Sequence, residues 1–272
     1  MNASLTVFIG GGNMASAIVG GLVKAGRNPQ CIVVVEPNEA QRETLQRQYG
    51  VRTLPVADGS LAQAQLVVWA VKPQSFRAAA APCAAFVSQA LQLSVMAGIR
   101  SDAIAQATGS ARVVRAMPNT PALIGRGISG LFARPAVSAA DRALVEEVLR
   151  PTGSTCWVGQ EQDLDAVTAL SGSGPAYVFY VVEAMMQAAV EMGLSEAQGR
   201  GLALATVAGA AALAEASADA PSVLRERVTS KGGTTHAALT VLEAEGVKPA
   251  FVKALKAAQQ RAKELGDEFG AA

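Results

Sequence analysis

Cysteine, histidine and clustered charge are scarce in this chain of 272 residues, and each scarcity argues against a class of protein. The three cysteines, Cys31, Cys83 and Cys156, are odd in number and widely spaced, so they suggest neither a disulfide framework nor a zinc site. We therefore expect no bound metal and a reducing, cytoplasmic setting. The net charge is +1, with lysine and arginine scattered along the chain, and we expect no nucleic-acid partner.

Long apolar runs are also missing. Residues 1–9 lack a basic region followed by a long apolar stretch, so we expect no signal peptide. The most membrane-like segment, residues 201–214, is rich in alanine and shorter than the roughly 20 residues that a membrane span requires. We expect a buried helix there and no membrane partner. Because 50% of the residues are hydrophobic, the chain can fill a substantial core.

What is present begins with a glycine-rich motif near the N-terminus. An apolar run of strand character, residues 5–9, leads directly into GGGNMA at residues 10–15 and then into a helical pattern. The spacing G-x-G-x-x-A assigns the tight turn to Gly10, the close approach of a pyrophosphate to Gly12, and the packing of helix on strand to Ala15. Taken alone, the motif also fits a plain structural turn.

A second apolar strand, residues 32–35, makes the dinucleotide interpretation more specific. It ends in Glu36, about where a Rossmann fold places the acid that binds an adenosine ribose. We expect a dinucleotide to contact the following residues: Ile9, Gly10, Gly11, Gly12, Asn13, Met14 and Glu36.

Two styles of sequence divide the chain into two predicted domains. Up to residue 160, short β-branched runs alternate with helical stretches, which predicts a Rossmann-type parallel sheet with helices on both faces. The predicted strands are residues 5–9, 32–35, 66–71, 91–96, 112–115, 128–132 and 155–158, with a helix at 139–149. From 161 to 272 the strand signals stop, and helices are predicted at 164–170, 175–192, 196–217, 221–228, 234–245 and 248–265.

The predicted helical domain is unusually rich in alanine and glycine. Small residues permit close approach of helices but bury little apolar area per residue. We expect two copies of the chain to intertwine their helical domains in a homodimer. A monomeric bundle is the alternative.

A polar turn near the C-terminal end opens into a helix within residues 228–243, VTSKGGTTHAALTVLE. Two glycines, Gly232 and Gly233, let the backbone approach a ligand, and the helix behind offers unpaired N–H groups. Ser230, Thr234 and Thr235 add hydroxyls. The turn suits a carboxylate, although an ordinary helix cap would show the same composition.

Five blocks now appear in order along the chain. They are FIGGGNMA, AVKP at 70–73, RAMPNTPALIGRG at 115–127, LSGSGPAY at 170–177, and VTSKGGTTHAALTVLE. With these blocks the chain resembles the pyrroline-5-carboxylate reductase family over essentially its whole length. The resemblance implies a Rossmann domain, a helical domain that dimerises, and possible assembly of dimers into a ring such as a decamer.

The resemblance also implies a reaction and its residues. Hydride passes from NADPH or NADH to the C=N carbon of L-1-pyrroline-5-carboxylate, giving L-proline. Thr235 takes the catalytic place near the ring nitrogen, and the substrate carboxylate lies against Ser230, Gly232, Gly233 and Thr234. Glu161 and Arg227 match further positions near the substrate.

Further cofactor contacts follow from the same blocks. The family match adds Ala70, Val71, Lys72 and Pro73, then Met96 and Ala97 after the next strand, and Asn119 in the stiff MPNTP loop. Without the family, Lys72 fits equally well as a surface lysine.

The chain departs from the family pattern at a few positions. Lys231 replaces a proline that is usual before the glycine pair, and Arg227 stands where relatives often have a smaller polar residue. A carboxylate at Glu36 repels a 2′-phosphate and favours NADH, yet Asn38 and Arg42 are close enough to reshape that pocket. The choice of cofactor stays open.

Two alternatives share part of the pattern. A β-hydroxyacid dehydrogenase has a similar N-terminal fingerprint but carries a catalytic lysine after a glycine turn, and the segment after Gly174, PAYVFYVVEAMM, has none. A non-catalytic dinucleotide-binding sensor has no need of the SKGGTT turn. We also interpret His236 as structural, because on a helix it points about 100° away from Thr235, and Arg100 and Arg112 as solvated charges.

Overall fold

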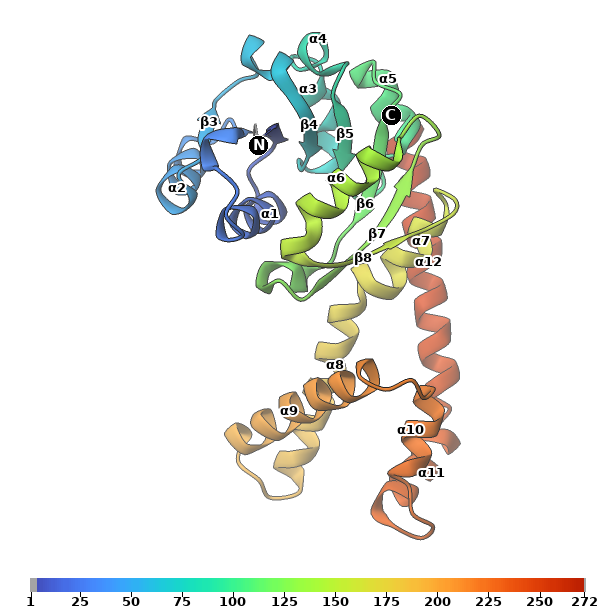
Figure 1. Ribbon diagram of the computed structural model, residues 1–272. Coiled ribbons are helices and arrows are strands. Elements are labelled where there is room, and N and C mark those ends of the chain that lie inside the picture. The colour runs from blue at the N-terminus through green and yellow to red at the C-terminus, as the bar shows by residue number, and fades with distance from the viewer. Residues whose placement is uncertain (1–3, 272) are drawn as a thin grey trace. The chain divides into compact units, whose positions relative to one another are not determined.

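The computed structural model describes residues 4–271 of the chain (Figure 1). Contacts divide the chain into two compact units. One unit consists of residues 1–173 together with 258–272, and the other of residues 174–257. The sequence placed the domain boundary after residue 160, and that boundary stays a prediction. Each unit is described by itself.

The first unit is built on an eight-stranded sheet. The strands are β1 (Leu5–Ile9), β2 (Ile32–Val35), β3 (Arg52–Leu54), β4 (Ala64–Trp69), β5 (Leu91–Ser94), β6 (Val113–Met117), β7 (Gly127–Ala133) and β8 (Gly153–Trp157). Their order in the sheet is β3-β2-β1-β4-β5-β6-β7-β8. The order reverses between β1 and β4, so the carboxyl ends of these two strands open a crevice of the kind that binds ligands in doubly wound folds.

Helices cover both faces of this sheet, because the buried strands are apolar on both sides. They are α1 (Asn13–Lys24), α2 (Glu39–Tyr49), α3 (Phe76–Ala80), α4 (Ala84–Val87), α5 (Ser101–Thr108), α6 (Ala139–Leu149) and α7 (Asp163–Val167). Alternate residues of β1 point to opposite cores: Phe8 packs with α1, α2 and α6, whereas Val7 and Ile9 pack with α3, α4 and α5. Figure 1 shows α1 and α6 on the same face of the sheet.

The second unit is helical. It contains α8 (Gly174–Glu191), α9 (Glu196–Glu215), α10 (Pro221–Arg227) and α11 (Thr234–Ala244), and the first part of α12 (Val247–Ala271). Helices α8 and α9 pack closely, since Gly199 of α9 lies so near α8 that a Cβ there would be 2.8 Å from the Cβ of Ala189. Tyr177 and Phe251 make an edge-to-face contact with ring centroids 5.9 Å apart.

Many large apolar side chains of this helical unit face outward. Tyr180 is 75% exposed, Met192 75% and Leu213 60%. Exposed apolar area on this scale is typical of a surface that another chain covers. Among the helices of the described residues, none is both long and apolar enough to cross a membrane.

The predicted Rossmann sheet followed by helices is confirmed, and helix α6 begins and ends where the sequence placed it. The sheet departs from the predicted parallel arrangement at one position, because β7 runs antiparallel to β6. Residues 118–126 are all that join these two strands, and a parallel crossover needs a dozen residues or more. Strand β3, only three residues long, was missed because its sequence, RTL, lacks an apolar run.

Candidate active site

The glycine motif forms a tight turn between β1 and α1. The backbone of Gly10 has a φ of +96°, and a Cβ there would lie 2.7 Å from the carbonyl oxygen of Ala70. Only glycine fits this position without strain. The Gly10 N–H donates to the carbonyl of Val35 at 2.9 Å, and the Ala70 N–H donates to Ile9 at 2.8 Å. These bonds tie the ends of β1, β2 and β4 together at the crevice.

Helix α1 begins at this turn with its N–H groups available. Its N-cap is Gly12, whose missing side chain cannot cap the helix, and a Cβ on Gly12 would have no neighbour within 4 Å. The exposed residues Gly12 and Asn13 therefore present a helix N-terminus to solvent, an arrangement that binds phosphate. Ala15, by contrast, is fully buried against the sheet.

Glu36 lies beside this turn and is fixed by the backbone. Its carboxylate accepts the Gly11 N–H at 2.8 Å through Oε2 and the Asn38 N–H at 2.9 Å through Oε1. Arg42 turns its guanidinium to the carbonyls of Glu36 and Pro37, at 2.9 and 2.8 Å. The carboxylate is thus held at the end of β2, where an adenosine ribose binds in this fold.

A cavity of about 550 Å³ follows the carboxyl ends of β1 to β4. Among the predicted cofactor residues, those that line it are Ile9, Gly10, Gly12, Glu36, Ala70, Val71 and Lys72. Much of the remaining wall is apolar, with Val56, Ala57 and Ala79 among its residues. The volume and the mixture of apolar wall and backbone donors suit a nucleotide.

Three other predicted cofactor residues come just after the next strands of the same sheet, β5 and β6. Met96, which is 3% exposed, and the exposed Ala97 follow β5. Asn119 follows β6, and its side-chain amide is committed to the backbone: it accepts the Ile128 N–H at 3.0 Å and donates to the Ser171 carbonyl at 3.2 Å. The predicted cofactor residues that do not line the cavity are Gly11, Asn13, Met14, Pro73, Met96, Ala97 and Asn119.

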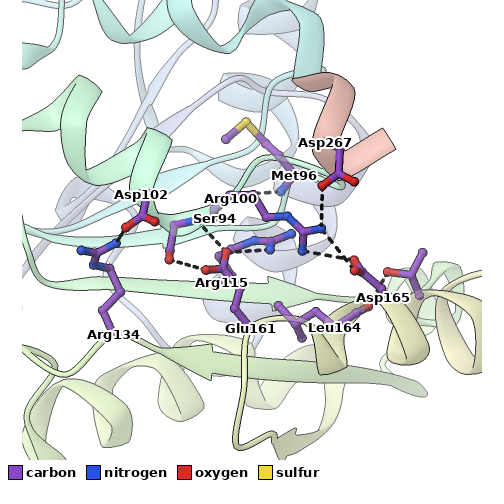
Figure 2. Close-up of polar contacts among 12 residues, drawn as sticks. Ser94, Met96, Arg100, Asp102, Arg115, Arg134, Glu161, Leu164, Asp165 and Asp267 are labelled. Carbon is purple, nitrogen blue, oxygen red and sulfur yellow. Dashed lines mark hydrogen bonds and ion pairs between the residues drawn. The ribbon is translucent and has the colours of Figure 1, made fainter. Parts of the chain in front are cut away.

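A polar network lies next to the loop that carries Met96 (Figure 2). Glu161 accepts hydrogen bonds from the backbone N–H and the hydroxyl of Ser101, both at 2.6 Å, and from the Arg115 guanidinium at 2.8 Å. Arg100 pairs with Asp165 at 3.2 Å and with Asp267 at 3.8 Å. Both oxygens of Glu161 are therefore already used within the sheet unit.

Arg115 is the most deeply placed charge of this network. Its side chain is 6% exposed, and it comes from the middle of the apolar strand β6. Burial lowers the pKa of Arg115, while the charge of Glu161 and the hydrogen bond to it oppose that shift. An unpaired carboxylate or guanidinium here would be costly, so the two charges depend on each other.

The sequence interpretation of Arg100 as a solvated charge is wrong, because its side chain is 21% exposed and paired with Asp165. Arg112 is more exposed, but it forms an ion pair with the buried Asp141. Sequence reasoning also missed Arg115 and Ser101. An arginine inside the apolar run VVRAM was the one available signal, since a buried charge needs a partner.

The polar turn of the helical unit has a defined geometry. The Gly233 N–H donates to the Ser230 carbonyl at 3.0 Å, and Gly232 has a φ of +75°. This is a four-residue turn with glycine at its third position and Lys231 at its second. Gly233 is then the N-cap of α11 and supplies no side-chain cap, so the first N–H groups of that helix remain available.

The turn brings several predicted substrate residues together. The Ser230 hydroxyl lies close to Gly233, since a Cβ on that glycine would be 2.8 Å from the Ser230 Oγ. Thr234 and Thr235 are the first two residues of α11, with Thr235 half-buried and Thr234 exposed. Arg227, at the end of α10, is 61% exposed and pairs with Asp219.

These features define a class of protein. A glycine turn that opens a helix, an acid at the end of β2 and a nucleotide-sized cavity at the switch point are those of a nicotinamide-dependent oxidoreductase of the Rossmann type. The family profile described as NADP oxidoreductase coenzyme F420-dependent matches residues 6–98, and the profile described as pyrroline-5-carboxylate reductase dimerisation matches residues 161–265.

Full-length relatives narrow the class. The chain is 41% identical to the pyrroline-5-carboxylate reductase of Haemophilus influenzae over 99% of its own length and 100% of that protein. It is also similar to the structure of a pyrroline-5-carboxylate reductase from Coxiella burnetii, with a TM-score of 0.92, 38% identity, and coverage of 97% of this chain and 99% of that one. A Plasmodium falciparum pyrroline carboxylate reductase crystallised with NADP matches at a TM-score of 0.86 and 26% identity, covering 98% of this chain and 99% of that one.

The chain belongs to the pyrroline-5-carboxylate reductase family. It is an oxidoreductase that uses NADPH or NADH, and it carries the dimerisation domain of that family. The family resemblance seen in the sequence blocks is confirmed. The β-hydroxyacid dehydrogenase and sensor alternatives are set aside.

Proposed function

We propose that this chain reduces L-1-pyrroline-5-carboxylate to L-proline. The observation that carries the proposal is similarity over the full length to pyrroline-5-carboxylate reductases, with both the cofactor cavity and the SKGGTT turn present. A bound reduced nicotinamide supplies the hydride, which adds to the imine carbon while the ring nitrogen keeps one proton. The iminium form of the substrate is already electrophilic, so the residues mainly have to position it.

The glycine turn and its neighbours hold the cofactor in this proposal. The N–H groups at the start of α1, near Gly12 and Asn13, face the pyrophosphate, and Glu36 accepts a ribose hydroxyl. Ala70, Val71 and Lys72 border the cavity on the β4 side. Met96 and Ala97 lie beside the nicotinamide, and Pro73 and Asn119 keep the loops around it in place.

The turn of the helical unit holds the substrate carboxylate. The unpaired N–H groups of α11 and the positive end of its dipole favour an anion. Gly232 and Gly233 leave the backbone accessible, while the Ser230 and Thr234 hydroxyls donate further hydrogen bonds. Lys231 and Arg227 add positive charge to the neighbourhood, and Arg227 is free to leave its exposed pair with Asp219.

Thr235 is the catalytic group of this proposal. Its hydroxyl lies in the first turn of α11, directly after the carboxylate-binding residues. There it can donate to, or exchange a proton with, the ring nitrogen of the substrate. His236, the next residue, is exposed and has no role in the reaction.

The proposed function also includes an oligomeric state and a cellular location. The chain forms homo-oligomers through its dimerisation domain, and we propose that the unit is a dimer in which the exposed apolar side chains of α8 and α9 are covered. Association of dimers into a ring such as a decamer is part of the same proposal. We place the protein in the cytoplasm, where Cys31, Cys83 and Cys156, all free, stay reduced, and we assign it no nucleic-acid or membrane partner.

The test is a paired assay with purified protein. Loss of reduced-nicotinamide absorbance is followed with L-1-pyrroline-5-carboxylate as substrate and with NADH or NADPH as cofactor, and proline is identified as the product. The assembly is measured by light scattering on the same sample. A mass of one chain would contradict the dimer, and cofactor binding without oxidation would contradict the reaction.

A further inference from the structure

The loop after β5 joins Met96 and Ala97, which the proposed function assigns to the cofactor, to the polar network around Glu161. Residues 95–100 lead from β5 to Ser101, the first residue of α5. Met96 is 3% exposed, and its N–H donates to the Ser94 hydroxyl at 3.2 Å. The loop carries Met96 and Ala97, which the proposed function places beside the nicotinamide, so its position decides where the reacting ring can sit.

Helix α5 does not cap its own N-terminus. Its N-cap residue, Arg100, makes no side-chain cap hydrogen bond. The carboxylate of Glu161, 60 residues beyond Ser101 in the chain, caps the helix instead. It accepts both the Ser101 N–H and the Ser101 hydroxyl at 2.6 Å. A carboxylate at this end of a helix is also favoured by the helix dipole.

Arg115 makes this contact possible. It donates to the same Glu161 oxygen that accepts the Ser101 N–H, at 2.8 Å, and thereby compensates a carboxylate that is only 15% exposed. Charged hydrogen bonds in such surroundings are short and strong. Glu161 is therefore held from β6 on one side and holds α5 on the other.

A second contact fixes the end of the same loop. Figure 2 shows the Arg100 guanidinium between the carboxylates of Asp165 and Asp267. Next to it, a Cβ on Gly98 would lie 2.7 Å from the Phe269 ring, so the last part of α12 packs directly on the loop. The loop thus has carboxylate contacts at its last residue, Arg100, and at Ser101, which follows it, and no spare room at Gly98.

We propose that Glu161 is a positioning residue for the cofactor and does not touch the substrate. It fixes the Met96–Ala97 segment through Ser101, and Arg115 holds its carboxylate in place. This inference rests on the proposed function, which assigns Met96 and Ala97 to the nicotinamide, and it replaces the direct substrate contact that the family resemblance implied for Glu161.

The experiment measures cofactor binding in the absence of the imine. Dissociation constants for NADH and NADPH are determined by calorimetry for the wild type, Glu161→Ala, Ser101→Ala and the double variant. We expect Glu161→Ala to weaken binding by about tenfold, the effect of roughly one charged hydrogen bond. Ser101→Ala should have a smaller effect, and the double variant should be weaker by less than the product of the two factors, because both act through one contact.

Hydrogen exchange gives a second readout on the same proteins. Amides of residues 95–105 should exchange faster in Glu161→Ala than in the wild type. The matched control is Asp102→Asn, which removes an exposed carboxylate of the same helix that pairs with Arg134. Asp102→Asn should leave the dissociation constants unchanged and should raise the exchange of residues 95–105 less than Glu161→Ala does. If Glu161→Ala does not fold, the test falls to Ser101→Ala, which keeps the backbone bond to Glu161. Its cofactor dissociation constants and the exchange of residues 95–105 are then compared with those of the wild type.

Unchanged cofactor binding and unchanged exchange in Glu161→Ala, with a raised KM for the imine, would overturn the proposal and return Glu161 to the substrate. The proposal would also be overturned if Glu161→Ala left the cofactor affinity, the hydrogen exchange and the KM for the imine all unchanged. Because binding and exchange are read without the imine, they remain interpretable if the wild type fails to reduce that substrate, in which case the proposed function alone is contradicted.

Discussion

The carboxylate of Glu36 accepts the backbone N–H of Gly11 at 2.8 Å, which joins the acid at the end of β2 to the glycine turn at the end of β1. A second N–H, from Asn38, occupies the other oxygen. A fixed negative charge at this position repels a 2′-phosphate, and the Arg42 guanidinium that could offset it is bonded to backbone carbonyls.

From this contact we predict that the chain uses NADH more efficiently than NADPH. Glu36→Ser should raise kcat/KM for NADPH and lower it for NADH, with a change of about tenfold or more in their ratio. The measurement is kcat/KM for both cofactors at a saturating imine concentration. A ratio that stays the same in Glu36→Ser would show that another group reads the 2′ position.

The glycine turn offers a matched pair of variants. Gly10→Ala places a Cβ 2.7 Å from the Ala70 carbonyl at a φ of +96°, so we expect a loss of about 2 kcal/mol or more in the free energy of unfolding. Gly12→Ala meets no atom within 4 Å, and its cost should stay near 0.5–1 kcal/mol for the poorer helix cap.

Cofactor binding distinguishes the two glycines further. Gly12→Ala should bind the dinucleotide at least about tenfold more weakly although it remains folded, because its methyl group points to where the pyrophosphate approaches. Urea unfolding and calorimetric titration make both measurements. Equal stability of the two variants, or full cofactor affinity of Gly12→Ala, would contradict this assignment of the turn.

Thr235→Ala tests the catalytic hydroxyl. We expect kcat to fall by about 100-fold or more, since a positioned proton donor contributes on that order, while the dissociation constant for the cofactor stays unchanged. Thr235→Ser, which keeps the hydroxyl, is the control and should retain most of the rate. If kcat fell only slightly in Thr235→Ala, Thr235 would not be the catalytic group, although the proposed reaction would still stand.

Lys231 lies at the second position of the turn that Gly232 and Gly233 complete. Proline is favoured there because its ring fixes φ near the value that the turn requires. Lys231→Pro should therefore stabilise the protein by about 0.4–1 kcal/mol, through the unfolded chain. A urea unfolding series checks this, and a destabilised variant would show that the turn has a different backbone conformation.

The lowered pKa of Asp141 predicts part of the loss of stability of the fold in acid. Its pKa is lowered, first by the hydrogen bond from Arg112 and then by bonds from Ser138. The native state therefore binds fewer protons than the unfolded chain, so Asp141 stabilises the fold above its unfolded pKa of about 3.9 and loses this effect as the pH falls through the folded pKa.

The matching variant is Asp141→Asn, which should be less stable than the wild type at neutral pH by about 1–3 kcal/mol. The difference should shrink below about pH 4, as the wild-type carboxyl takes up its proton. Unfolding curves recorded at several pH values give this difference directly. A constant difference over the whole range would contradict the cause given for the pKa.

The sequence predicted the strands and helices that have strong local patterns. Leu5–Ile9 and Ile32–Val35 are buried runs bounded by turn residues, and Ala139–Leu149 follows the Ser138 cap. The antiparallel pairing of β7 was not predicted, because it depends on the length of the link from β6.

The polar contacts of Glu161 next to the site could not be predicted from local sequence patterns. Glu161 meets Ser101 and Arg115 only after the chain has folded, and these residues are 60 and 46 positions away. The glycine turn could be identified because its spacing is local. The network required the three-dimensional arrangement, and Arg100 was misread for the same reason.

The reductase activity is tested directly by oxidation of NADH or NADPH by the purified protein with L-1-pyrroline-5-carboxylate, with proline identified as the product. We predict oxidation that requires the imine, yields proline in equal amount to the cofactor consumed, and is faster with NADH. Cofactor binding without any oxidation in the presence of the imine would contradict it.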